Sequence, residues 1–157
     1  MTDTTRAGAL GRPVFYLMLA GTLALITACY SAGYRKEMAA TVDLLSGLTD
    51  KLADYCTAGF AVDERQISSE EMGEFYYALG KAEAFSAMRR AQAQRPSYRE
   101  FSTLLEQYAA FVHSADEYRL AGLAGHPDPV QLARLIAQRD AVRKTASRVR
   151  TDLASEK

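Results

Sequence analysis

Apolar residues recur every three or four positions along most of the chain, which is the spacing of an amphipathic helix. Four such stretches predict helices at about 35–58, 69–93, 98–120 and 129–155. The last stretch has the strictest repeat, formed by Leu132, Leu135, Arg139, Val142, Ala146, Val149 and Leu153. Because the connections are short, neighbouring helices are expected to run antiparallel. The pattern therefore predicts an all-α fold, an antiparallel up-down four-helix bundle that follows an N-terminal apolar segment.

Capping signals mark where three of these helices begin. Ser68 stands three residues before Glu71, and Ser97 stands three residues before Glu100, which is the spacing of a capping box. Asp128 precedes a proline, an arrangement typical of an N-cap followed by the first helical residue. These signals support the boundaries that the apolar pattern predicts.

The composition favours helices over strands. The chain has 27 alanines but only 7 valines and 3 isoleucines, whereas sheets are rich in β-branched residues. A formal net charge of zero and 10% aromatic residues exclude a disordered chain and a polycationic nucleic-acid binder. A length of 157 residues allows a single domain.

The N-terminal part of the chain has a different pattern. Residues 14–28 carry no charge, and they follow a polar stretch that contains Arg6 and Arg12. A basic region followed by an apolar region that ends in small residues is the layout of an export signal.

The end of this apolar stretch resembles the lipobox of bacterial lipoproteins. Residues 26–29 read Ile-Thr-Ala-Cys, with an aliphatic residue three positions before the cysteine and a small residue directly before it. The resemblance implies cleavage before Cys29 and attachment of acyl chains such as palmitate, which together anchor a protein stably. The expected division is a signal at 1–28 and a bundle at 29–157, held in the periplasm on the cell membrane or outer membrane.

An uncleaved membrane helix is the alternative. The charge-free stretch at 13–34 is 22 residues long, enough to cross a hydrocarbon core of ~30 Å. The chain would then be a single-pass inner-membrane protein whose orientation the flanking charges leave open.

Candidate chemistry is sparse. His113 and His126 are the only histidines, and no Cys–His cluster has the spacing of zinc ligands. Along one continuous helix, Cys29 and Cys56 would lie roughly 40 Å apart, too far for a disulfide. Cys56 is therefore expected to be a buried free thiol. We predict no metal, no cofactor and no catalytic residue, and hence a protein that is not an enzyme.

Charge is distributed unevenly. Residues 37–74 carry nine acids and two bases, and residues 130–157 carry seven bases and three acids. The first and last helices of such a bundle are neighbours, so one interpretation is that these charges pair internally. The other is that five basic residues bind anionic headgroups or an acidic partner: Arg134, Arg143, Lys144, Arg148 and Arg150. Arg139, on the apolar stripe, is expected to pair with an acid of a neighbouring helix.

Tyrosines form the remaining candidate surface. Tyr76, Tyr77 and Tyr98 stand on or beside the apolar stripes, where such rings serve packing, an interface or a small-ligand pocket. The leading hypothesis is a non-catalytic, membrane-anchored accessory or binding subunit of an envelope protein assembly. Its partners would be membrane lipid and other membrane or envelope proteins, without nucleic acid. The alternative is a small-ligand-binding or sensory bundle with an aromatic-lined cavity, which a pocket with convergent polar groups would favour.

Overall fold

A computed structural model shows two compact units, one ending at Met38 and the other beginning at Ala39. Its backbone is described for residues 11–58, 61–62, 65–66, 68–125 and 128–156. Its side chains are described for residues 32–58, 68–125 and 128–156.

The described residues of the first unit belong to helix α1 (Gly11–Thr57), which continues into the second unit. The predicted signal or anchor at 1–28 and its acylation residue Cys29 lie outside the residues whose side chains are described. Among the residues that are so described, no helical stretch is both long and apolar enough to cross a membrane.

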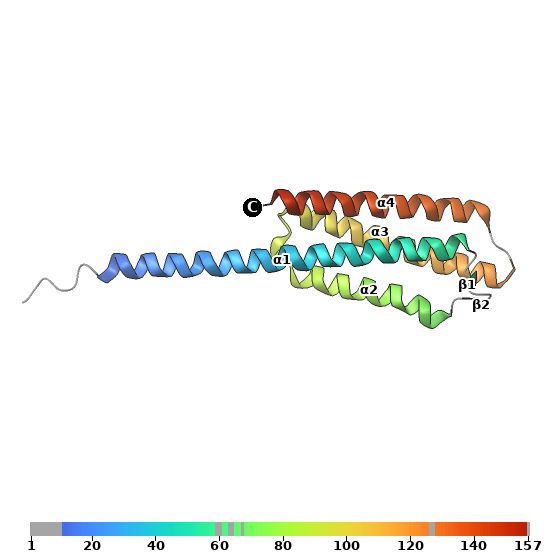
Figure 1. The fold of residues 1–157 in the computed structure, drawn as a ribbon, viewed down its shortest axis with the longest axis horizontal. Coiled ribbons are helices and arrows are strands. Elements are labelled where there is room, and N and C mark those ends of the chain that lie inside the picture. The colour runs from blue at the N-terminus through green and yellow to red at the C-terminus, as the bar shows by residue number, and fades with distance from the viewer. Residues whose placement is uncertain (1–10, 59–60, 63–64, 67, 126–127, 157) are drawn as a thin grey trace, which may run out of the picture. The chain divides into compact units, whose positions relative to one another are not determined.

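The second unit is a bundle of four helices (Figure 1). The last part of α1 is followed by α2 (Ser69–Met88), α3 (Pro96–Leu123) and α4 (Pro129–Ser155). A pair of two-residue antiparallel strands, β1 (Ala61–Val62) and β2 (Arg65–Gln66), lies between α1 and α2. The prediction of an all-α bundle with four helices is confirmed for the described residues.

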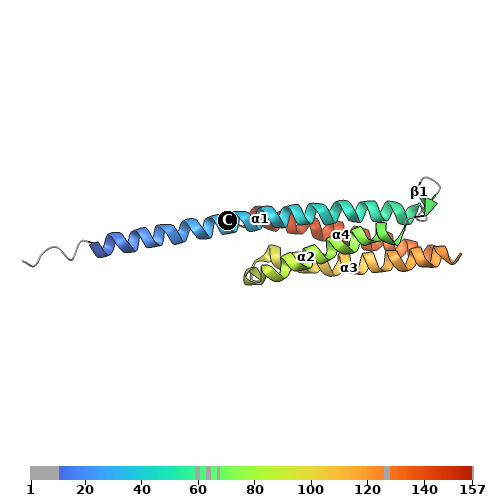
Figure 2. The same cartoon turned by 90° about the horizontal axis from the view of Figure 1, so that it is seen from below.

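Contacts between the chain's distant parts show the antiparallel order. The backbone N–H of Ser97, in the first turn of α3, donates to Glu156 just after α4, at 3.0 Å. Near the same end, Arg150 of α4 pairs with Asp43 of α1 at 2.9 Å. Figure 2 shows α2 and α3 side by side along their lengths. Each helix therefore packs against the next, and α4 returns to α1.

The core follows the axis of the bundle. Its largest fully buried side chains include Val42, Leu45, Leu52, Met72, Phe75, Phe101, Leu104, Tyr108, Phe111 and Leu135. The rings of Tyr55 and Phe75 meet edge to face at 6.2 Å and join α1 to α2. Those of Phe85 and Phe101 meet in the same way at 5.7 Å and join α2 to α3. Apolar burial of this extent is the main source of the bundle's stability.

Two of the predicted helix caps are present and one is not. Ser68 accepts from the N–H of Glu71, whose carboxylate accepts from the N–H of Ser68, so this capping box is confirmed. The side chain of Asp128 caps α4, because it accepts a hydrogen bond at 2.8 Å from the backbone N–H two residues later. The capping box predicted at Ser97 is wrong, because α3 begins at Pro96, two residues before the predicted start at 98, and Ser97 lies inside the helix. The backbone N–H of Ser97 instead donates to the carboxylate that follows α4.

The turn between α2 and α3 starts earlier than the apolar pattern suggests. The predicted helix reaches residue 93, whereas α2 ends at Met88 and a short 3₁₀ helix, η1 (Arg90–Gln92), follows. Arg95 precedes Pro96 and is extended, with φ −74° and ψ 139°, as the proline ring requires of the residue before it. The reversal of the chain is therefore completed between Met88 and Pro96.

Candidate functional site

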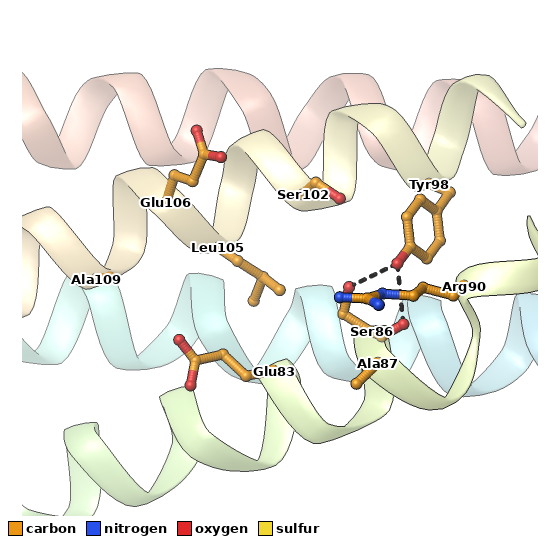
Figure 3. A pocket seen from close by; sticks show the side chains of 9 residues that line it. All are labelled: Glu83, Ser86, Ala87, Arg90, Tyr98, Ser102, Leu105, Glu106 and Ala109. Carbon is orange, nitrogen blue, oxygen red and sulfur yellow. Dashed lines mark hydrogen bonds between the residues drawn. The ribbon is translucent and has the colours of Figure 1, made fainter. Parts of the chain in front are cut away.

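A groove with a volume of about 370 Å³ lies between α2 and α3 (Figure 3). Its lining residues are Glu83, Ser86, Ala87, Arg90, Tyr98, Ser102, Leu105, Glu106 and Ala109. The volume falls within the range of small-molecule sites in proteins. The groove is therefore the candidate functional site.

The helical repeat explains why these residues share one surface. The lining residues from α2 and η1 follow one another at intervals of three, one and three, so they lie on one face. Those from α3 are spaced by four, three, one and three, with the same result. Four lining residues are alanine or serine, namely Ser86, Ala87, Ser102 and Ala109. Their small side chains leave the space that larger ones would fill.

Tyr98 fixes one end of the groove. Its hydroxyl donates to the backbone oxygen of Ser86 at 2.9 Å and lies 3.1 Å from the Ser86 Oγ. Because Tyr98 is in the first turn of α3 and Ser86 is in the last turn of α2, this contact ties the two helix ends together. Figure 3 places the guanidinium of Arg90 beside this pair.

Three charged side chains line the groove. Arg90 lies at the Tyr98 end, while Glu83 of α2 and Glu106 of α3 lie toward the other end, where Glu106 extends along α3 away from α2 (Figure 3). Within the described part of the chain, none of the three forms an ion pair or a side-chain hydrogen bond. They are therefore available to a bound molecule.

The predicted basic residues of α4 mostly face the bundle itself. Arg150 lies 2.9 Å from Asp43 of α1, and Arg143 lies 3.5 Å from Asp50 of the same helix. Arg148 reaches a carboxylate of α3 at 3.5 Å. These contacts correspond to the first of the two interpretations of the charge pattern, in which the charges pair within the bundle.

Arg134 and Lys144 complete the predicted basic set. Both are exposed, and neither makes an ion pair with another described residue. The structure thus leaves two of the five basic residues free to meet a partner at the surface.

Among the described residues, Arg139 has no acidic partner on a neighbouring helix. Its guanidinium contacts Asp140, the next residue of α4, at 2.9 Å, and 27% of its side chain is exposed. The predicted partner was therefore wrong. Arg139 stands at the margin of the buried stripe, so its long side chain reaches the solvent-facing carboxylate beside it.

The three predicted tyrosines occupy different places. Tyr98 lines the groove, and Tyr77 is exposed with the Lys81 ammonium 5.4 Å from its ring centre. Tyr76 lies at another point between α2 and α3, where its hydroxyl donates to Asp116 at 3.4 Å and lies 3.3 Å from a ring nitrogen of His113. Partial burial, and then the negative charge of Asp116, raise the pKa of Tyr76.

The same polar cluster contains a charged residue that the sequence did not indicate. Arg119 is 6% exposed and binds Asp116 at 2.8 Å, three residues earlier on α3. The spacing of three is an ordinary helical ion pair, so no motif marks it. The cluster is satisfied within itself and offers less to a ligand than the groove does.

The described cysteine and histidine have no metal-binding arrangement. Cys56 is a buried free thiol, as predicted, and loss of solvation raises its pKa to about 12. Among the described residues, no three His, Cys, Asp or Glu side chains gather closely enough to hold a metal ion.

The sequence indicated Tyr98 but none of the three charged residues of the groove. Glu83, Arg90 and Glu106 are ordinary surface charges in the sequence, and only the packing of α2 on α3 brings them to one groove. Two small residues, Ser86 and Ala87, beside the apolar stripe were the one available signal. Comparison with protein-family models, curated proteins and solved structures finds no match for this chain.

Proposed function

We propose that this chain is a non-catalytic binding protein of the bacterial envelope, whose bundle takes up a small molecule in the groove between α2 and α3. The observation that supports this function is a groove of suitable size lined by charges without a partner among the described residues. The N-terminal segment would attach the bundle to the membrane, through acylated Cys29 or as an uncleaved helix.

The contrast with the other helix contacts strengthens the proposal. Between α1 and α2, Lys51 pairs with Glu74 at 2.6 Å, and the α1–α4 contact has two such pairs. The charged side chains at those contacts thus pair with one another within the bundle. Charged side chains without an ion-pair partner beside a cavity are a feature of ligand sites, where polar groups orient a bound molecule.

A substitution that blocks the groove with a larger side chain tests this function. The full-length chain in lipid nanodiscs is titrated with four six-carbon probes (hexanol, hexanoate, hexylamine and 6-aminohexanoate), and binding is measured by saturation-transfer NMR. Ala87→Phe places a ring in the groove and should abolish binding of the probes that bind. Ala84→Phe, at an exposed position of α2 outside the groove, is the matched control and should leave binding intact. Binding that is equal in both variants would contradict the function.

Protein binding is the second candidate function. Leu120 and Leu123 at the end of α3 and Val130 at the start of α4 are large apolar side chains that are at least half exposed. Exposed apolar groups that flank one turn are typical of a contact surface. Leu123→Asp should then reduce co-purification of membrane proteins from solubilised membranes. Met88→Asp, at an exposed apolar position at the end of α2, is the control.

A further inference from the structure

The charges of the groove are separated along its length. In Figure 3, Arg90 lies with Tyr98 and Ser86 at one end, and the two glutamates lie toward the other. The apolar side chain of Leu105 projects between them. The groove therefore offers a positive end, an apolar middle and a negative end.

The positive end is suited to an acidic group. A guanidinium presents its N–H donors in a planar fork that matches a carboxylate or phosphate. Arg90 has no acidic partner within the described residues, and the Ser86 hydroxyl lies beside it. A bound anion would accept charge-assisted hydrogen bonds from Arg90 in place of the hydrogen bonds that Arg90 makes to water.

The negative end is suited to an amine. Glu83 of α2 lies there, and no described lysine or arginine pairs with its carboxylate, whereas the carboxylate of Glu106 points away from α2 (Figure 3). An ammonium group donates up to three hydrogen bonds, so it can bind the Glu83 carboxylate. An anion at this end would meet like charge.

We propose that the groove binds a small amphoteric molecule, with an ammonium group at Glu83, an acidic group at Arg90 and a short apolar spacer over Leu105. This assignment rests on the proposed function. A fully apolar ligand would bury these charges without a partner, which is unfavourable. A ligand with a single charge would pair with one end and leave the charge at the other end without a partner, so the groove should bind it less tightly.

The four six-carbon probes test the ligand class, because they differ only in their charged ends. We expect 6-aminohexanoate to bind about tenfold or more tightly than hexanoate, hexylamine or hexanol. Shorter and longer ω-amino acids then measure the preferred separation of the charges. Equal affinity for the four probes, or tightest binding of hexanol, would overturn the ligand class.

Two variants assign the ends. Arg90→Gln should weaken binding of 6-aminohexanoate but not that of hexylamine. Glu83→Gln should weaken binding of 6-aminohexanoate but not that of hexanoate. Arg134→Gln and Glu117→Gln remove exposed charges outside the groove and are the controls.

The ligand class and the proposed function can fail separately. If Ala87→Phe abolishes binding of the probes but the charge variants leave it unchanged, the amphoteric ligand is disproved. The groove then remains a binding site. If no probe binds in a way that Ala87→Phe abolishes, both proposals are wrong.

Discussion

Tyr98 and Tyr108 carry the same hydroxyl in opposite surroundings. The Tyr98 hydroxyl donates to a backbone oxygen, whereas the Tyr108 hydroxyl is fully buried and has no hydrogen-bond partner among the described residues. Burial also raises the pKa of Tyr108, so the phenol stays neutral. A buried polar group without a partner keeps its desolvation cost and gains nothing in return.

This difference predicts opposite outcomes for one substitution. Tyr98→Phe should lower the free energy of unfolding by about 1 kcal/mol, the usual worth of a hydrogen bond. Tyr108→Phe should leave the free energy unchanged or raise it, because it removes an unsatisfied hydroxyl and keeps the ring. Urea unfolding of the two variants beside wild type measures both. A larger loss in Tyr108→Phe than in Tyr98→Phe would show that the buried hydroxyl has a partner after all.

The thiol of Cys56 should be unreactive in the folded protein. The thiolate is the reactive form, and burial raises the pKa of this thiol from 9.0 to about 12. In a Cys29→Ser background, Ellman's reagent at pH 8 should therefore react only after denaturant is added. Because the unfolded thiol ionises first as the pH rises from 9.0 toward 12, stability contributed by the neutral thiol should be lost across that window. Rapid reaction of the folded protein at pH 8 would contradict this burial.

At the scale of helices, the contact between α1 and α4 is electrostatic at its surface. Arg143→Gln and Arg150→Gln each remove one exposed ion pair with α1. Each should lower the free energy of unfolding by less than about 1 kcal/mol, and 1 M salt should remove most of the difference. Lys144→Gln, at an exposed position without such a pair, is the control. Thermal unfolding at two salt concentrations makes the comparison, and a salt-independent loss would point to packing rather than charge.

The helices were predictable because their signals are local. The apolar repeats and the capping box at Ser68 depend on residues within one or two turns, and the structure has both. The start of α3 was misplaced because Pro96 and a carboxylate from the far end of the chain determine it. That contact spans 59 residues, so no local pattern reports it.

The groove was less predictable than the helices. Its shape depends on which small side chains of α2 face which of α3, a property of tertiary packing. The sequence identified Tyr98 through its place beside a stripe, but Glu83 and Glu106 resemble any other exposed acid. The partners of Arg139 and Arg148 depend in the same way on the rotation of α4.

At the scale of the whole molecule, the N-terminal segment decides how the bundle is attached. If Cys29 carries the lipid, the mature protein from a bacterial host lacks residues 1–28, and Cys29→Ser leaves the full-length precursor without acyl chains. Cys56→Ser should change neither processing nor membrane association, because that thiol belongs to the bundle core. Intact mass spectrometry distinguishes these products. A wild-type protein that retains its first residues would instead be held by an uncleaved helix.

The attachment of Glu156 to the first turn of α3 has a consequence for synthesis. Helices α1, α2 and α3 leave the ribosome first, while α4 is still inside the exit tunnel. Until α4 has emerged, the apolar side chains that it covers stay open to water, and Ser97 lacks its acceptor. A nonsense codon within α4 would leave this three-helix intermediate permanently exposed to chaperones and proteases. The emergence of α4 therefore completes the bundle.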